Sequence, residues 1–257
     1  MVPRPRAVAW SSDPDVPEFA RRGLQLGPAD DSARAHVSAA CGFAFRNNAL
    51  VREALTHCSR QFEPSYQRLE FLGDAVLDFA VTSALYEHRG CFTPGVITYA
   101  RQAAVSNDTL ARRCVAMGLH ARIRHFSKNL ATSVAATVRA VEEAPPLELG
   151  PPEPEEGSGG SDVDGSDDEV VIVEPKPKRH KLCKSCADVV ESLIGAMFVE
   201  AARDSAGTED PEEGVSCLTG IPRRCRDKAQ EVVAEKVLSH IVPLEECGAL
   251  RRARGEA

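Results

Sequence analysis

Two acidic residues, Glu70 and Asp74, lie four positions apart within a run of mostly apolar residues. At helical spacing, positions i and i+4 lie on one face, so the two carboxylates point the same way. Burying two like charges side by side is costly unless a cation or hydrogen bonds offset the repulsion. The alternative is a solvent-facing pair, but an exposed face more commonly places Lys or Arg at i+4. The pair therefore favours a buried face on which something offsets the two charges.

A second acidic pair, Asp188 and Glu191, lies three positions apart at the start of another apolar segment. Asp188 has an alternative explanation, because Ser185 and Asp188 have the spacing of a capping box. Glu191 is not explained that way. Together the four carboxylates offer oxygen ligands, which suit a hard cation such as Mg²⁺ or Mn²⁺. The sequence has no Glu-x-x-His pair, which disfavours a di-iron helical bundle.

The segment that carries the first pair, 66–89, has no internal proline and is apolar almost all round. This pattern predicts a helix that is buried on most of its surface. Gly73 lies between the two acids, and Gly195 lies in the later acidic segment. Glycine inside a helix costs about 1 kcal/mol relative to Ala, so we expect both glycines to allow close helix crossing. Phe71 and Leu72 lie between Glu70 and Gly73, and we expect at least one of them to face away from the core.

Capping and turn residues predict the other helices. Thr93-Pro94-Gly95 ends one helix region and starts the next, because proline suits a first helical turn. Asn47 can cap a short helix, and Gly118 is a natural helix stop. The expected helices cover about 47–55, 66–89, 94–104, 106–117, 130–143, 185–202 and 227–241. The expected fold class is therefore all-α, a helical bundle.

Composition sets the domain limits. Residues 142–174 hold twelve acidic residues and no Lys or Arg, and removing those charges from the net −7 leaves +5 for the rest of the 257 residues. A phosphate-bearing partner is therefore allowed. The basic cluster within 176–181 is either a solvated loop or a nuclear-import or RNA-contacting patch. We expect a folded domain over 32–143 and 182–245, a disordered acidic insertion at 144–181, and tails at 1–31 and 246–257.

The sequence supports neither a membrane-spanning helix nor a signal peptide for export. No apolar run approaches the roughly 18 to 20 residues of a spanning helix, and the first residues lack the apolar core of a signal peptide. Nine cysteines form an odd set, which favours reduced thiols and a cytoplasmic or nuclear location. Cys183 and Cys186 have zinc-ligand spacing, but Cys217 and Cys225 are too widely spaced to form the second pair.

Three segments resemble the ribonuclease III family. Residues 66–78 are similar to its signature, 54–59 to the segment before it, and 184–196 to its second acidic motif, in the family's order. Tyr66-Gln67, residues 93–98 and the insertion are most similar to the second ribonuclease III domain of Dicer-type enzymes. Two departures are Ala187, where the family usually has glycine, and Tyr99, where Dicers often have an acidic residue.

The resemblance implies an all-α endonuclease domain that cleaves double-stranded RNA in small-RNA processing, with Mg²⁺ as cofactor and Mn²⁺ as the alternative. The family's catalytic metal ligands correspond to Glu70, Asp74, Asp188 and Glu191. The family works as homodimers or as internal pairs of domains, each cutting one strand. The chain carries one signature, so it is expected to be a minimal homodimeric enzyme or a fragment of a larger Dicer-like protein. The rival reading is a non-catalytic RNA-binding or ribosome-associated relative, but such relatives typically lose one or more of the acids.

Overall fold

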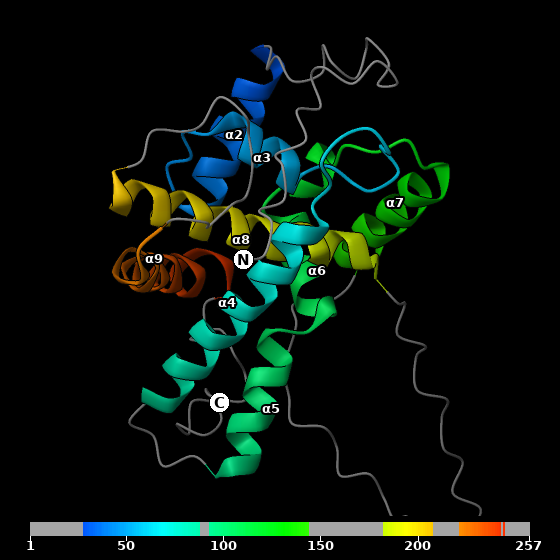
Figure 1. Cartoon of the computed structure of the whole chain (residues 1–257). Coiled ribbons are helices and arrows are strands. Elements are labelled where there is room, and N and C mark those ends of the chain that lie inside the picture. Colours follow the sequence, from blue (N-terminus) through cyan, green and yellow to red (C-terminus); the bar gives the residue numbers. More distant parts are fainter. Residues whose placement is uncertain (1–27, 88–92, 144–181, 208–220, 243, 245–257) are drawn as a thin grey trace, which may run out of the picture.

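The computed structural model describes residues 28–87, 93–143, 182–207, 221–242 and 244. These residues form helices and no strand; Thr56 and Arg124 make one isolated bridge. The predicted all-α fold is confirmed (Figure 1). The α-helices are α2 (Pro28–Cys41), α3 (Asn48–Ala54), α4 (Gln67–Glu87), α5 (Pro94–Ala104), α6 (Asn107–Ala116), α7 (Lys128–Glu143), α8 (Lys184–Ala206) and α9 (Arg223–Lys236). A 3-10 turn, η2 (Leu119–Arg122), follows α6, and a π turn, η3 (Val237–Ile241), follows α9.

Helix α8 is the centre of the fold. It runs through the middle of the molecule, with α4 crossing it and α6 and α9 packed on its other sides (Figure 1). Every residue from Cys186 to Arg203 is buried. A helix with so little exposed surface needs neighbours on every side, and α8 has them.

Helix α4 differs from the prediction. It buries one face, made of Leu69, Gly73, Val76, Leu77, Ala80, Val81 and Leu85. Its other face is open: Phe71 is 84 % exposed and Phe79 is 53 % exposed. The prediction of a helix buried on most of its surface was therefore wrong, whereas the expectation that Phe71 or Leu72 faces away from the core is confirmed. The far half of α4 extends from the body with α5 alongside it (Figure 1).

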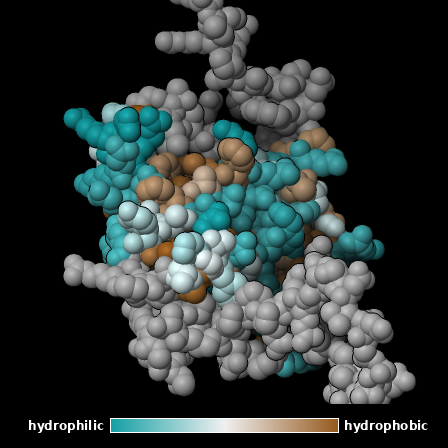
Figure 2. All heavy atoms as spheres, turned by 90° about the horizontal axis from the view of Figure 1, so that it is seen from below, coloured by the Kyte–Doolittle hydropathy of each residue, from teal (hydrophilic) through white to brown (hydrophobic). Residues whose placement is uncertain are grey.

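An ion pair of 2.6 Å between Arg101 Nε on α5 and Asp78 Oδ1 on α4 joins these two helices. Figure 2 views the molecule from the side to which they extend, and it shows apolar groups open at the surface among polar ones. Neighbouring helices of this chain therefore leave part of the apolar surface uncovered.

Several helix boundaries follow the residues that predicted them. The side chains of Asn47, Thr93 and Ser106 accept hydrogen bonds from backbone N–H groups in the first turns of α3, α5 and α6. Gly118 follows α6 with a φ of 67°, the left-handed conformation that favours glycine. Local capping chemistry therefore sets these ends.

Other helix boundaries differ from the predicted ones. Helix α2 begins at Pro28, inside the segment assigned to the N-terminal tail, and α8 continues to Ala206. Within α7, Thr137 Oγ1 accepts a hydrogen bond of 2.8 Å from Cys183 N, which fixes the start of α8 against α7. The predicted acidic insertion, the basic cluster, most of the predicted N-terminal tail and all of the predicted C-terminal tail lie outside the described residues. Among the helices that the structure describes, none has the length and apolar character needed to cross a membrane.

Candidate metal centre

Two glycines set the contact between α4 and α8. A Cβ atom on Gly73 would lie 1.7 Å from the carbonyl oxygen of Glu191, and one on Gly195 would lie 2.2 Å from the carbonyl oxygen of Leu69. Neither position has room for a side chain, so the two backbones touch at this crossing. The predicted role of Gly73 and Gly195 in close helix crossing is confirmed, and both acidic pairs lie next to this contact.

The crossing brings three of the four predicted carboxylates together. Glu70, Asp188 and Glu191 each offer an oxygen atom, and these atoms lie within 4.8 Å of one another. Asp188 is 6 % exposed and Glu191 is 9 % exposed, while Glu70 is half-buried. Asp74 is exposed and lies outside this close group, so the expectation that both acids of α4 are buried was wrong for Asp74.

Burial and mutual repulsion both disfavour the negative charges of these carboxylates. The pKa of Glu191 rises to about 7 because burial disfavours its charged form and because Asp74, Asp188 and Glu70 repel a further negative charge. Asp74 therefore acts on the cluster through its charge, although it lies at the edge. A set of ligands made only of carboxylate oxygens, buried at one end and open at the other, fits a hard divalent cation.

Lys184 places a positive charge directly against this cluster. Its Nζ donates a hydrogen bond of 2.5 Å to Asp188 Oδ1 and one of 3.1 Å to Glu70 Oε1. The hydrogen bond to Asp188 is the largest cause of a raised Lys184 pKa. An ammonium group thus bridges an acid of α4 and an acid of α8, as a bound cation would. No pattern in the sequence predicted this role, although Lys184 precedes Asp188 by one helical turn.

Tyr66 binds the second carboxylate oxygen of Asp188. It is buried just before α4, and its hydroxyl donates a hydrogen bond of 3.2 Å to Asp188 Oδ2. Burial is the largest cause of its raised pKa, so the hydroxyl keeps its proton and remains a donor. The capping explanation for Asp188 does not hold, because α8 begins after Cys183 and the Asp188 oxygens bind Lys184 and Tyr66.

Comparison with known proteins identifies the family. The model of the ribonuclease III domain matches residues 67–202, which include the α4–α8 crossing and all four acids. The chain belongs to the ribonuclease III family. The resemblance seen in its acidic motifs is thereby confirmed.

The relatives of this ribonuclease III chain include Dicer proteins. It is 34 % identical over 194 residues to Endoribonuclease Dicer homolog 1 of Oryza sativa subsp. japonica, covering 75 % of this chain and 9 % of the relative. It is 36 % identical over 163 residues to Endoribonuclease Dcr-1 of Drosophila melanogaster, covering 62 % and 7 %.

A shorter relative is Ribonuclease 3-like protein 3 of Oryza sativa subsp. japonica, which is 34 % identical over 180 residues, covering 68 % of this chain and 50 % of that protein. The chain thus spans about half of this relative and a tenth or less of the two Dicer proteins. What it shares with all three is the ribonuclease III region.

Proposed function

We propose that this ribonuclease III domain is a metal-dependent endonuclease that cleaves double-stranded RNA. Glu70, Asp74, Asp188 and Glu191 are its proposed metal ligands and catalytic residues, and Mg²⁺ is the proposed cofactor, with Mn²⁺ as an alternative. The observation that supports this most is the convergence of three carboxylates at a backbone contact without room for side chains. A rigid crossing keeps the ligand oxygens in place before the cation binds.

Each residue of the site has a separate task in this proposal. Asp188 and Glu191 are the buried anchors, and Tyr66 fixes the orientation of Asp188. Glu70 and the exposed Asp74 complete the open side, which faces the substrate. A bound divalent cation would polarise a phosphate oxygen and lower the pKa of a water molecule.

Lys184 links the site to the substrate in this proposal. Its side chain is 62 % exposed, so its ammonium group can turn from the carboxylates toward an anionic substrate once a metal ion neutralises them. The exchange keeps the charge of the site balanced in both states.

We further infer that the domain acts as a pair. One chain offers one acidic cluster, and cleavage of both strands of a duplex requires two clusters related by a two-fold axis. Phe71 lies next to Glu70 on α4 and is 84 % exposed, as expected for a residue that a partner covers. The partner is a second copy of this chain or another ribonuclease III domain, in a homodimer or pseudo-dimer.

The biological setting follows from the same reasoning. Relatives named as Dicer endoribonucleases support a role in small-RNA processing for this domain. Six cysteines in the described part of the chain are free thiols. We therefore infer a reducing compartment, the cytosol or the nucleus.

Cleavage of a long RNA duplex in Mg²⁺ tests the function. We expect products with Mg²⁺ and none with EDTA. Glu191→Gln should abolish cleavage while RNA binding survives, because the amide keeps the shape of the side chain and removes the charge that a metal ion needs. Glu231→Gln, on the exposed face of α9, is the matched control and should cleave normally. A Glu191→Gln variant that cleaves at nearly the wild-type rate would exclude Glu191 as a ligand.

A further inference from the structure

The segment between α3 and α4 carries a side chain that orients an acid of the candidate metal centre. Residues 55–66 form turns and one isolated bridge instead of a regular helix. Tyr66 ends this segment, and its hydroxyl donates a hydrogen bond of 3.2 Å to Asp188 Oδ2. Connecting segments are in general more mobile than the helices they join. A residue of such a segment that orients a metal ligand therefore needs a support of its own.

Thr56 supplies this support at the backbone of Tyr66. Tyr66 N donates a hydrogen bond of 2.9 Å to Thr56 O, so the two ends of the segment meet there. Thr56 is fully buried, with 0 % of its surface exposed. Its hydroxyl donates a hydrogen bond of 2.6 Å to Arg52 O and accepts one of 2.8 Å from Arg124 Nη1. The backbone of Tyr66 is thus attached to a residue that α3 and the segment after η2 both hold.

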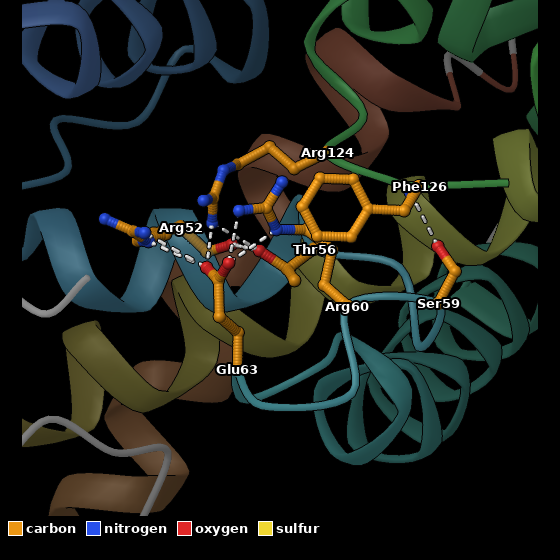
Figure 3. Close-up of polar contacts among 7 residues, drawn as sticks. All are labelled: Arg52, Thr56, Ser59, Arg60, Glu63, Arg124 and Phe126. Carbon is orange, nitrogen blue, oxygen red and sulfur yellow. Dashed lines mark hydrogen bonds and ion pairs between the residues drawn. The ribbon is translucent and has the colours of Figure 1, made fainter. Parts of the chain in front are cut away.

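Glu63 holds the middle of the segment against the same arginines. Figure 3 shows three guanidinium groups converging on the Glu63 carboxylate, with Thr56 beside them. Arg52 Nη2 lies 3.0 Å and Arg124 Nη1 lies 2.8 Å from Glu63 Oε2. Arg60 pairs with the other oxygen, Oε1. Both oxygens of Glu63 are therefore bound, and a satisfied polar network of this kind makes a rigid anchor.

The Glu63 anchor stays charged at neutral pH. Burial by itself raises the pKa of Glu63, but hydrogen bonds from Arg60 and Arg52 and the charge of Arg124 bring this pKa below its ordinary value. The ion pair between Glu63 and Arg124 is therefore intact at the pH at which the carboxylates of the metal centre are used. Arg124 is held on one side by Glu63 and binds Thr56 on the other.

A continuous line of hydrogen bonds runs from this anchor to the acidic cluster. It passes from Arg124 through Thr56 to Tyr66 and ends on Asp188, and each bond is 3.2 Å or shorter. A purely structural role for these contacts predicts that breaking them lowers stability alone. A positioning role predicts in addition that the carboxylates of the folded protein bind a cation less well.

We propose that Thr56 is a positioning residue of the metal centre, which holds Tyr66 where its hydroxyl orients Asp188 toward the cation. This inference rests on the proposed function, in which the acidic cluster binds a divalent cation. Thr56 touches neither the cation nor the substrate and acts only through Tyr66. The anchor at Glu63 fixes Thr56 by way of Arg124.

The test measures the affinity for Mn²⁺ alone, without RNA, from the loss of the paramagnetic resonance signal of the free ion. Thr56→Val keeps the shape of the side chain and removes the hydroxyl. We expect Mn²⁺ to bind about 3- to 10-fold more weakly, which is less than the roughly 10- to 100-fold loss typical when a group in contact with a metal ligand is removed. Thr56→Ser keeps the hydroxyl and should bind Mn²⁺ as the wild type does.

Thr109→Val is the matched control. It removes another buried hydroxyl, which donates a hydrogen bond of 2.7 Å to Ala103 O, and should lose stability without losing Mn²⁺ affinity. In a Tyr66→Phe background, Thr56→Val should weaken Mn²⁺ binding no further, because the contact with Asp188 is already lost. Wild-type-like Mn²⁺ affinity of Thr56→Val, or the same fold-loss in both backgrounds, would overturn the proposal.

Urea unfolding of these variants in EDTA separates a failure of this proposal from a failure of the proposed function. If the wild type bound no Mn²⁺, the proposed function would lose its metal centre, and the unfolding free energies would decide the link by themselves. Non-additive losses for Thr56→Val and Tyr66→Phe would support it, and additive losses would overturn it. If Thr56→Val did not fold, Glu63→Gln would test the same line of contacts: weaker Mn²⁺ binding supports the proposal and unchanged binding overturns it.

Discussion

Helices α8 and α4 carry the same number of proposed ligands but occupy opposite settings. Every residue from Cys186 to Arg203 of α8 is buried, so its two acids are held from all sides. Helix α4 buries one face and exposes the other, and its Asp74 is open to solvent. The difference indicates that α8 is the fixed frame of the site, whereas α4 joins the core to an open surface, where we propose that substrate and partner bind.

The largest expected effect comes from breaking the contact between the two helices. Gly73→Ala would place a Cβ atom 1.7 Å from Glu191 O, so α4 and α8 must separate. We expect the free energy of unfolding in urea to fall by about 3 kcal/mol or more, since overpacked cores lose this much.

Gly95→Ala is the matched control for this substitution. Its added Cβ atom would meet no atom closer than Thr93 Oγ1 at 4.0 Å, and it should be neutral or slightly stabilising. Equal stability of Gly73→Ala and Gly95→Ala would show that the crossing is looser than the geometry indicates.

The second prediction concerns the buried acid of α8. The pKa of Glu191 is raised from 4.5 to about 7, so the folded protein binds more protons than the unfolded chain between these values. The contribution of Glu191 to stability is therefore complete below pH 4.5 and is lost as pH rises through about 7. The loss amounts to about 3 kcal/mol.

Urea unfolding in EDTA from pH 4.5 to 8 measures this contribution as the difference between wild type and Glu191→Gln. The Gln variant lacks the titrating group, so it should gain stability relative to wild type as pH rises. Parallel curves for the two proteins would show that Glu191 is not held in a charge-crowded site.

The third prediction tests the cation that joins the two helices. Lys184→Gln removes the ammonium group that bridges Glu70 and Asp188. We expect cleavage to fall by about 10- to 100-fold, as is typical when a group that supports metal ligands is lost.

The pH profile of Lys184→Gln is the more specific readout. Lys184 lowers the pKa of Glu191, so its loss should move the rise of activity toward higher pH. Lys128→Gln, an exposed lysine on α7, is the control. A reduced rate with an unshifted pH profile would mean that Lys184 supports cleavage without acting on the carboxylates.

The smallest effect on stability is expected at the exposed face of α4. Phe71→Glu should change the free energy of unfolding by no more than about 0.5 kcal/mol, because the side chain is 84 % exposed. It should weaken self-association, measured by sedimentation at micromolar concentration. Phe62→Glu, an exposed residue of the segment before α4, is the control. Unchanged association of Phe71→Glu would move the pairing surface elsewhere.

Much of the site could be predicted from the sequence because its residues lie in short motifs. The spacing of Glu70 and Asp74, and of Asp188 and Glu191, follows helical periodicity, and glycine inside a helix has few explanations. The exposure of α4 could not be predicted in the same way. An apolar residue such as Phe71 shows that burial would be favourable, but not whether the same chain covers it.

Single residues and distant clusters were harder to predict. Lys184 and Tyr66 act through one or two hydrogen bonds each, and no periodicity marks them. Arg52 from α3 and Arg124 from the segment after η2 both form ion pairs with Glu63, although about seventy positions separate the two arginines in the chain. Only folding brings them together, so spacing carried no signal.

The hydrogen bond between Thr137 and Cys183 has a consequence for how this family can vary. It joins two points of the chain that are 46 residues apart, so the chain between them starts and ends at an anchor made by folded helices. The entropy of closing a flexible loop grows only with the logarithm of its length, and a doubling costs about 0.6 kcal/mol. Insertions and deletions between these anchors should therefore cost little free energy, and length variation should accumulate there while the α4–α8 crossing stays unchanged.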